Sequence, residues 1–179
     1  MPIRALPDVL PDVISAEESC DSWFRLNPAT ALVAQEAILK AQYALETKEP
    51  QQNMTVITWR SGADPIVYTL CYTPPSLGGR PMLEGLEQWR VLRERMMVSA
   101  VIVCPPRGHL SEEEEERTRE LSTWSWKERV VIHDAFVRVL RENGINHRTL
   151  ENQLVCLEDQ AESVLRYWEK VGVENMERN

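Results

Sequence analysis

The stretch MTVITWRSGADPIVYTLCY, residues 54–72, decides how the middle of the chain is expected to fold. Residues 54–60 and 66–72 are rich in β-branched and aromatic side chains, which are typical of β-strands. Between them lies SGADP, whose glycine, aspartate and proline are typical of a loop. The pattern therefore predicts two strands that are joined as a β-hairpin.

The residues that follow predict one more helix and one more strand. A loop of turn formers, TPPSLGGRP (73–81), leads into an expected helix over 82–96. Residues 98–104 (VSAVIVC) are apolar on both faces, as in a strand that is covered on both sides. If this strand pairs with 66–72, the crossover should be right-handed and the pair parallel. We therefore expect an α+β fold with a small three-stranded mixed sheet of ββαβ order, flanked by helices.

The N-terminal part is expected to be an extended leader followed by helices. Residues 1–14 contain the tandem repeat LPDV-LPDV (6–13), whose prolines favour an extended backbone. The repeat is either a surface tail or a short docking peptide. Asn27 and Pro28 form a good helix start, and alanines then recur at steps of three and four, which predicts a helix over 28–47.

The C-terminal third is expected to be helical. Five glutamates, Glu112–Glu116, follow a capping-box spacing and predict a helix start, because negative charge is favourable there. A second capping box precedes an apolar helix from Trp126 that Asn143-Gly144 ends. A long apolar seam predicts a last helix over 148–171. We expect these two helices to form an antiparallel pair.

One domain is expected after the leader, over 15–179, with a mixed part at 15–107 and a helical part at 108–179. The net charge is −8 and the pI is about 5.0, which disfavours general binding to nucleic acid or anionic membranes. The four cysteines are far apart, as in a reducing compartment. We expect an intracellular, cytoplasmic protein, with a nuclear location left open.

No group of residues in the sequence has the spacing of a known catalytic or metal-binding motif. None of the three histidines has a His or Cys partner at helical spacing, so no metal and no cofactor is expected. Cys104 follows the expected buried strand, and the simpler interpretation is that it is a small buried side chain. The glycine loop gives one pocket candidate, in which Gly78, Gly79 and Arg80 would bind an anion or nucleotide.

These observations favour a non-catalytic role, as an interaction subunit or adaptor that binds a protein partner or a second copy through its helical C-terminal part. An enzyme or ligand-binding protein that uses the 78–80 loop is the alternative. A nucleic-acid-associated regulator comes third, because residues 148–170 hold three basic side chains against five acidic ones. The expected contact residues are Trp124, Leu157, Val164 and Trp168.

Overall fold

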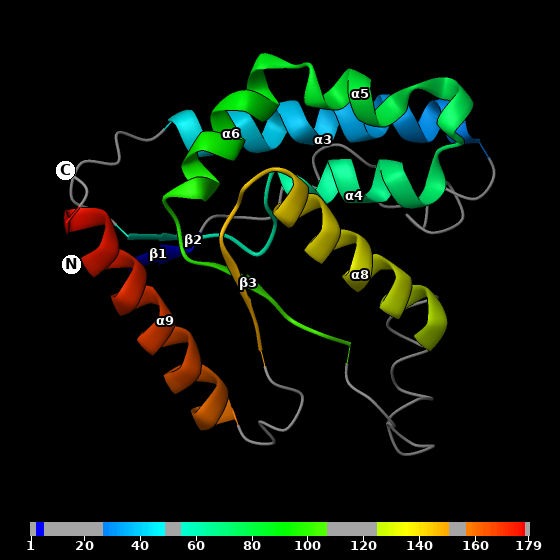
Figure 1. Ribbon diagram of the computed structural model, residues 1–179. Helices are drawn as coiled ribbons and strands as arrows, with labels where there is room; N and C mark the ends of the chain where they lie inside the picture. The colour runs from blue at the N-terminus through cyan, green and yellow to red at the C-terminus, as the bar shows by residue number, and fades with distance from the viewer. Residues whose placement is uncertain (1–2, 6–26, 49–54, 107–124, 151–156, 178–179) are drawn as a thin grey trace. The chain divides into compact units, whose positions relative to one another are not determined.

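The described part of the chain is predominantly helical and divides into two compact units, Met1–Arg93 and Glu94–Asn179 (Figure 1). Each unit contains one two-stranded parallel sheet. The computed structural model describes residues 3–5, 27–48, 55–106, 125–150 and 157–177. The predicted three-stranded mixed sheet is therefore wrong, and the fold is helix-rich with two very small sheets.

The predicted hairpin is the main error. The strand β2 (Thr55–Ile57) lies inside its first half, but β2 pairs in parallel with β1 (Ile3–Ala5), with Ile3 opposite Thr55. The second half, residues 66–72, belongs to the helix α4 (Ala63–Tyr72). Part of the expected leader is thus a strand, and the LPDV repeat lies outside the described residues.

Local hydrogen bonding explains why residues 63–72 form a helix despite their β-branched composition. The side chain of Asp64 accepts hydrogen bonds from the backbone N–H of Ser61 at 2.7 Å and from its hydroxyl at 3.1 Å, which fixes the helix entry. Pro65 lies in the first turn, where its missing N–H costs nothing. Tyr68 and Tyr72 then stack four residues apart, with ring centroids separated by 6.3 Å. Strand propensity depends on context, and here the bonds between Ser61 and Asp64 and the helical packing override it.

Helix α3 (Pro28–Lys48) confirms the predicted helix over 28–47. The side chain of Asn27 accepts a hydrogen bond from the N–H of Thr30 at 3.2 Å, as an N-cap does. The predicted alanine-rich face is buried at Ala31 and Ala34, and it packs against α4. Small residues on this face allow the two helix backbones to approach closely.

The predicted helix over 82–96 is two helices. A short 3-10 turn, η1 (Pro75–Leu77), leads into α5 (Gly79–Glu84), and α6 (Glu87–Met97) follows after the break at Gly85. The large buried side chains from these elements and from α3 and α4 include Ile38, Leu39, Ile66, Val67, Leu83, Trp89, Leu92 and Met96.

The second unit contains β3 (Val101–Val103), which confirms the strand predicted at 98–104. Its partner is β4 (His147–Thr149), with Val101 opposite His147, and the N–H of Leu150 donates to the carbonyl of Val103 at 3.0 Å. The predicted pairing with 66–72 is wrong, since that segment is helical. The pair is parallel, as expected for strands that are separated by a helix.

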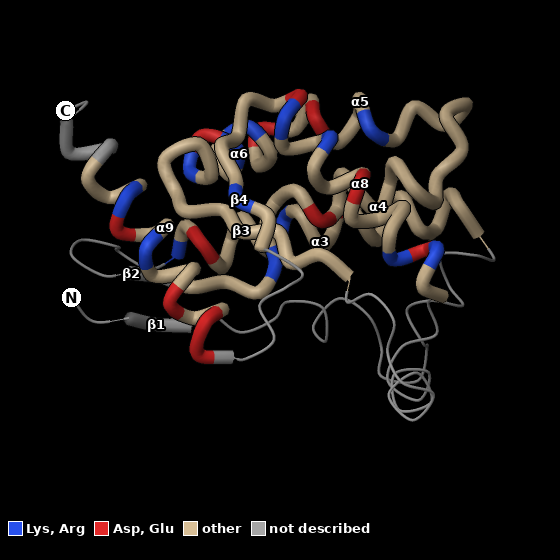
Figure 2. The backbone as a smooth tube through the Cα atoms, turned by 60° about the horizontal axis from the view of Figure 1, so that its bottom comes forward, with Lys and Arg blue, Asp and Glu red and all other residues tan. Residues whose placement is uncertain are grey.

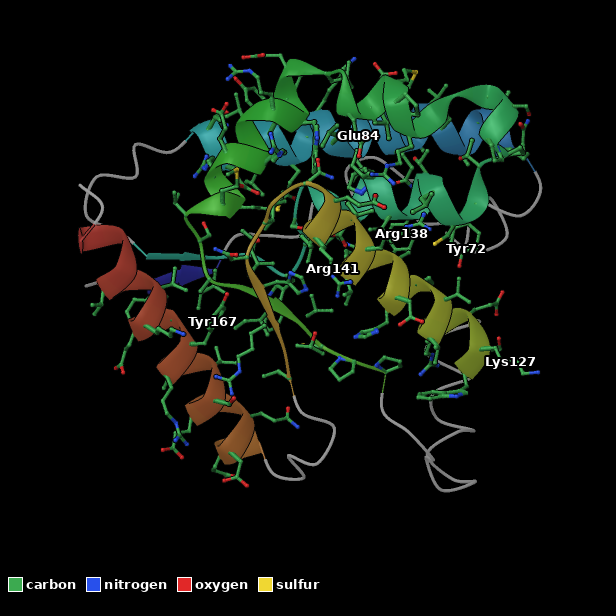
Figure 3. All side chains as sticks on the ribbon, viewed as in Figure 1. Tyr72, Glu84, Lys127, Arg138, Arg141 and Tyr167 are labelled. Atoms are coloured by element: carbon green, nitrogen blue, oxygen red, sulfur yellow. The ribbon has the colours of Figure 1, made fainter. Side chains whose placement is uncertain are left out.

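The helix α8 (Trp126–Glu142) lies between these strands in the chain and begins at the predicted capping box. The N–H of Glu128 donates to Ser125 Oγ at 3.3 Å, and the N–H of Ser125 donates to Glu128 Oε2 at 2.9 Å. Lys127, Arg138 and Arg141 of this helix, which Figure 3 labels, are exposed. Gly144 follows with φ +69°, in the left-handed conformation that ends helices.

The helix α9 (Leu157–Glu177) begins later than the predicted last helix, because residues 147–149 are a strand. The main packing partner of α8 is β3 rather than α9, so the predicted antiparallel helix pair is also wrong. The glutamate run at 112–116 lies outside the described residues. Among the described residues, no helix combines the length and the apolar character needed to cross a bilayer.

Candidate functional site

Helix α9 carries an exposed apolar stripe. Ala161, Leu165, Trp168 and Gly172 follow one another at steps of four, three and four, which places them on one face of the helix. The side chain of Leu165 is 50% exposed and that of Trp168 is 38% exposed. We call these four residues the α9 stripe. Large apolar side chains in its centre and small residues at its ends leave room for a second helix to lie along it.

The adjacent face of α9 is directed inward. Ser163 is buried, and Val164 and Tyr167 are half-buried. Figure 3 labels Tyr167. On a helix that turns about 100° per residue, this inward face lies next to the α9 stripe and does not overlap it. The helix can therefore keep its own packing while the α9 stripe remains exposed.

Two of the four predicted contact residues have described side chains. Trp168 lies in the α9 stripe, whereas Val164 lies on its half-buried border. Leu157 is the first residue of α9, and Trp124 lies outside the described residues. Leu165 is a contact candidate that the sequence analysis missed, because the predicted seam included the neighbouring Val164 instead. The signal in the sequence was that Leu165 lies three residues before Trp168, and residues at this spacing are neighbours on a helix surface.

One edge of the α9 stripe is acidic. Glu162 and Glu169 lie three residues before and four residues after Leu165, so both are its neighbours on the helix surface. Glu158 lies three residues before Ala161, so it is likewise a neighbour of the stripe on the helix surface. All three glutamates are exposed, and Figure 2 shows acidic residues at the start of the helix. We call Glu158, Glu162 and Glu169 the acidic edge.

The basic residues of α9 lie on the side of the helix opposite the α9 stripe. Arg166 and Lys170 are the two basic residues of the helix, and the 100° rotation per residue places both on the far side from the stripe. Arg166 reaches back to Glu162 at 3.1 Å, but both side chains are largely exposed. An exposed pair of this kind contributes little, so the acidic edge keeps its negative character.

The glycine loop has a different geometry from the one expected of an anion site. Gly78 has φ +60°, a left-handed conformation that favours glycine. Gly79 is buried against α4, and a Cβ atom there would lie 2.7 Å from Thr69 Cγ2. Arg80 donates from Nε to Glu84 Oε1 at 2.9 Å (Glu84 is labelled in Figure 3). Turn geometry, close packing and an ion pair thus account for the three residues, and the anion site stays a prediction.

Cys104 differs from its expected environment. It follows β3 directly and is exposed, so the interpretation of a small buried side chain is wrong. The strand ends one residue earlier than the apolar pattern suggests, and Cys104 lies beyond the covered part.

The described histidines have local partners. His133 Nδ1 lies 3.2 Å from Asp134 Oδ1, and His147 Nδ1 lies 3.1 Å from the carbonyl oxygen of Ile145. In the part of the chain that the structure describes, no three His, Cys, Asp or Glu side chains gather in a way that could hold a metal ion. His109 is outside that part.

A second exposed apolar feature lies in the first unit. Trp59 follows β2 and is 82% exposed, and Ile57, two residues earlier, is also exposed. Sequence reasoning placed both in a hairpin strand and did not single them out. These are two exposed side chains, whereas the α9 stripe is a row of four small or apolar residues at helical spacing with a charged edge.

Comparison with known proteins adds no relative: no protein-family model, no curated protein and no solved structure matches this chain. Function is therefore argued from the surfaces described above.

Proposed function

We propose that this protein is a non-catalytic interaction subunit or adaptor, whose contact surface is the α9 stripe. The observation that carries the proposal is the exposure of Leu165 and Trp168 on one face of α9. Exposed apolar side chains in a continuous row are typical of surfaces that bind other proteins, and tryptophan is enriched among residues that dominate binding energy.

The shape of the stripe supports a helical partner. A helix that packs against another helix needs an apolar row at steps of three and four, which Ala161, Leu165, Trp168 and Gly172 provide. The less exposed face of α9, which contains Ser163, Val164 and Tyr167, does not overlap the stripe, so a partner does not have to unfold the helix to bind. Recognition of this kind needs no catalytic group and no cofactor.

The test compares the wild-type protein with Leu165→Asp and Trp168→Ala in affinity capture from the native host, together with light-scattering mass. We expect both variants to lose the proteins that wild type retains, because an aspartate or a truncated ring removes the centre of the stripe. Val131→Asp is the matched control, since Val131 is an exposed valine on another helix, α8. An unchanged set of captured proteins and an unchanged mass in both stripe variants would contradict the proposal.

A further inference from the structure

The charges around the α9 stripe restrict the partner that fits it. The helix contains six acidic and two basic residues, and three of the acidic ones form the acidic edge. The two basic residues lie away from the stripe, so they offer little to an acidic partner. We propose, resting on the proposed function, that the occupant of the stripe is an amphipathic helix whose apolar face is bordered by lysine or arginine.

Electrostatic complementarity is the physical reason. A partner helix that lies along Leu165 and Trp168 places its flanking side chains beside Glu162 and Glu169, three and four residues from the centre of the stripe. Basic side chains at those positions form ion pairs, whereas acidic ones face like charge. Charges beside an apolar seam set partner choice and orientation in paired helices.

A second copy of this chain fits less well. In an antiparallel pair of α9 helices the same edge of both helices meets, so Glu158, Glu162 and Glu169 would face their own counterparts. In a parallel pair the acidic edge would face the border of Val164 and Tyr167, which has no basic residue and is half-buried. Neither arrangement neutralises the acidic edge.

The experiment uses two synthetic helical peptides that share one leucine and alanine stripe and differ only at the flanking positions, which are lysine in one and glutamate in the other. Fluorescence anisotropy measures their binding to the full chain at low and at moderate salt. We expect the lysine peptide to bind about tenfold more tightly than the glutamate peptide, with an advantage that falls as salt rises.

Charge reversal tests the edge directly. The triple variant Glu158→Lys, Glu162→Lys, Glu169→Lys is expected to reverse the preference between the peptides. Asp159→Lys is the matched control: Asp159 is exposed and lies in the same first turn as Glu158, but it is rotated about 100° further around the helix, away from the α9 stripe. It should leave the preference unchanged. Circular dichroism checks that each variant keeps its helix content.

Three outcomes overturn the inference. Equal binding of both peptides removes the role of charge. Retention of the lysine peptide by Leu165→Asp would mean that net charge attracts it without the stripe. A wild-type dimer that Leu165→Asp dissociates would identify a second copy as the occupant, and the proposed function would then stand while this inference fails. If neither peptide binding, mass nor protein capture depends on Leu165, both fail together.

Discussion

Gly79 lies so close to Thr69 that a Cβ atom at position 79 would be 2.7 Å from the Thr69 methyl carbon and 2.9 Å from Leu32 Cδ1. The start of α5 therefore contacts α3 and α4 through a glycine that has no space for a side chain. This contact gives a structural reason for the second glycine of the pair at 78–79, without any ligand.

The substitution Gly79→Ala is expected to lower the free energy of unfolding by about 1–3 kcal/mol, because the added methyl overpacks a buried contact. Urea unfolding that is followed by circular dichroism measures the change. The double variant Gly79→Ala, Thr69→Ser removes the methyl group that the new Cβ meets, and it should regain part of the loss. If Gly79→Ala leaves stability unchanged, the close packing is not what requires glycine here.

Gln35 and Gln42 are two buried glutamines on α3 with different surroundings. Gln35 is 2% exposed, and neither its side-chain nitrogen nor its oxygen has a hydrogen-bond partner among the protein groups that the structure describes. Gln42 is 3% exposed and donates to Glu46 Oε1 at 2.8 Å and to the carbonyl of Arg60 at 3.2 Å. The two residues offer a matched comparison within one helix.

We expect Gln35→Met to be neutral or stabilising, since methionine keeps the shape and removes a buried amide that lacks a partner. Gln42→Met should instead destabilise the fold by about 1 kcal/mol, because it removes the hydrogen bonds to Glu46 Oε1 and to the carbonyl of Arg60, although that carbonyl keeps the Thr58 hydroxyl as a donor. Thermal unfolding of the two variants side by side measures the difference. Equal losses for both would show that the amide of Gln35 makes a favourable interaction.

Asp64 predicts a pH dependence of stability. Burial raises the pKa of the Asp64 carboxyl, although the hydrogen bonds from Ser61 and the nearby Arg60 guanidinium act in the opposite direction. A carboxyl whose pKa is raised by folding resists ionisation in the folded state. The contribution of Asp64 to stability is therefore greatest below the ordinary pKa of 3.8 and is lost as pH rises through the folded-state pKa.

Asp64→Asn keeps the oxygen that accepts from Ser61 and removes the buried charge. Relative to wild type, the variant should gain free energy of unfolding as pH rises from about 3.8, and the gain should level off above the folded-state pKa. Urea titrations of the variant and of wild type over this pH range measure the difference in their free energies of unfolding. A relative loss of stability with rising pH would mean that the ionised carboxylate is the form that the fold favours.

The capping box of α8 predicts a simple stability change. Ser125→Ala removes the hydroxyl that accepts from the N–H of Glu128, and we expect a loss of about 1 kcal/mol in the free energy of unfolding. Ser125→Asp restores a cap of comparable strength and should retain most of the stability. Chemical denaturation distinguishes the two. Equal stability of Ser125→Ala and wild type would show that the cap is not required.

The elements with strong local signals were predicted correctly. Asn27 with Pro28 located the start of α3, and Ser125 with Glu128 located the start of α8. The strand at 101–103 followed from its continuous apolar run. In each case the signal is a cap or a pattern that acts over a few residues, so it depends little on the rest of the fold.

The strand prediction for residues 66–72 is wrong because tertiary packing, and not composition, makes this segment helical. Their β-branched and aromatic side chains fit either a pleated strand or a buried helix, and composition does not separate the two. The hydrogen bonds between Ser61 and Asp64 favour a helix start, but in the sequence the segment SGADP (61–65) is typical of a loop. Partner strands at 3–5 and 147–149 were missed because each contains only three residues.

The candidate site was predicted in part. The long seam predicted α9 and singled out Trp168, and as one row it was expected to pack either within the chain or against a second chain. The helix instead divides its apolar residues between an inward face and the α9 stripe, so Leu165 became the central exposed residue. Sequence periodicity shows that a helix is apolar on one side, and it does not show which part of that side the fold leaves uncovered.

The two parallel strand pairs have a consequence for the order of folding events. β1 cannot meet β2 until residues 55–57 are available, and β3 cannot meet β4 until residues 147–149 are available. Each pairing closes a long segment, which has an entropic cost, and offers only a short ladder in return. The helices should therefore form first, with strand pairing as the late step. Slow development of hydrogen-exchange protection at Leu150, whose N–H bonds to Val103, would report that step during refolding.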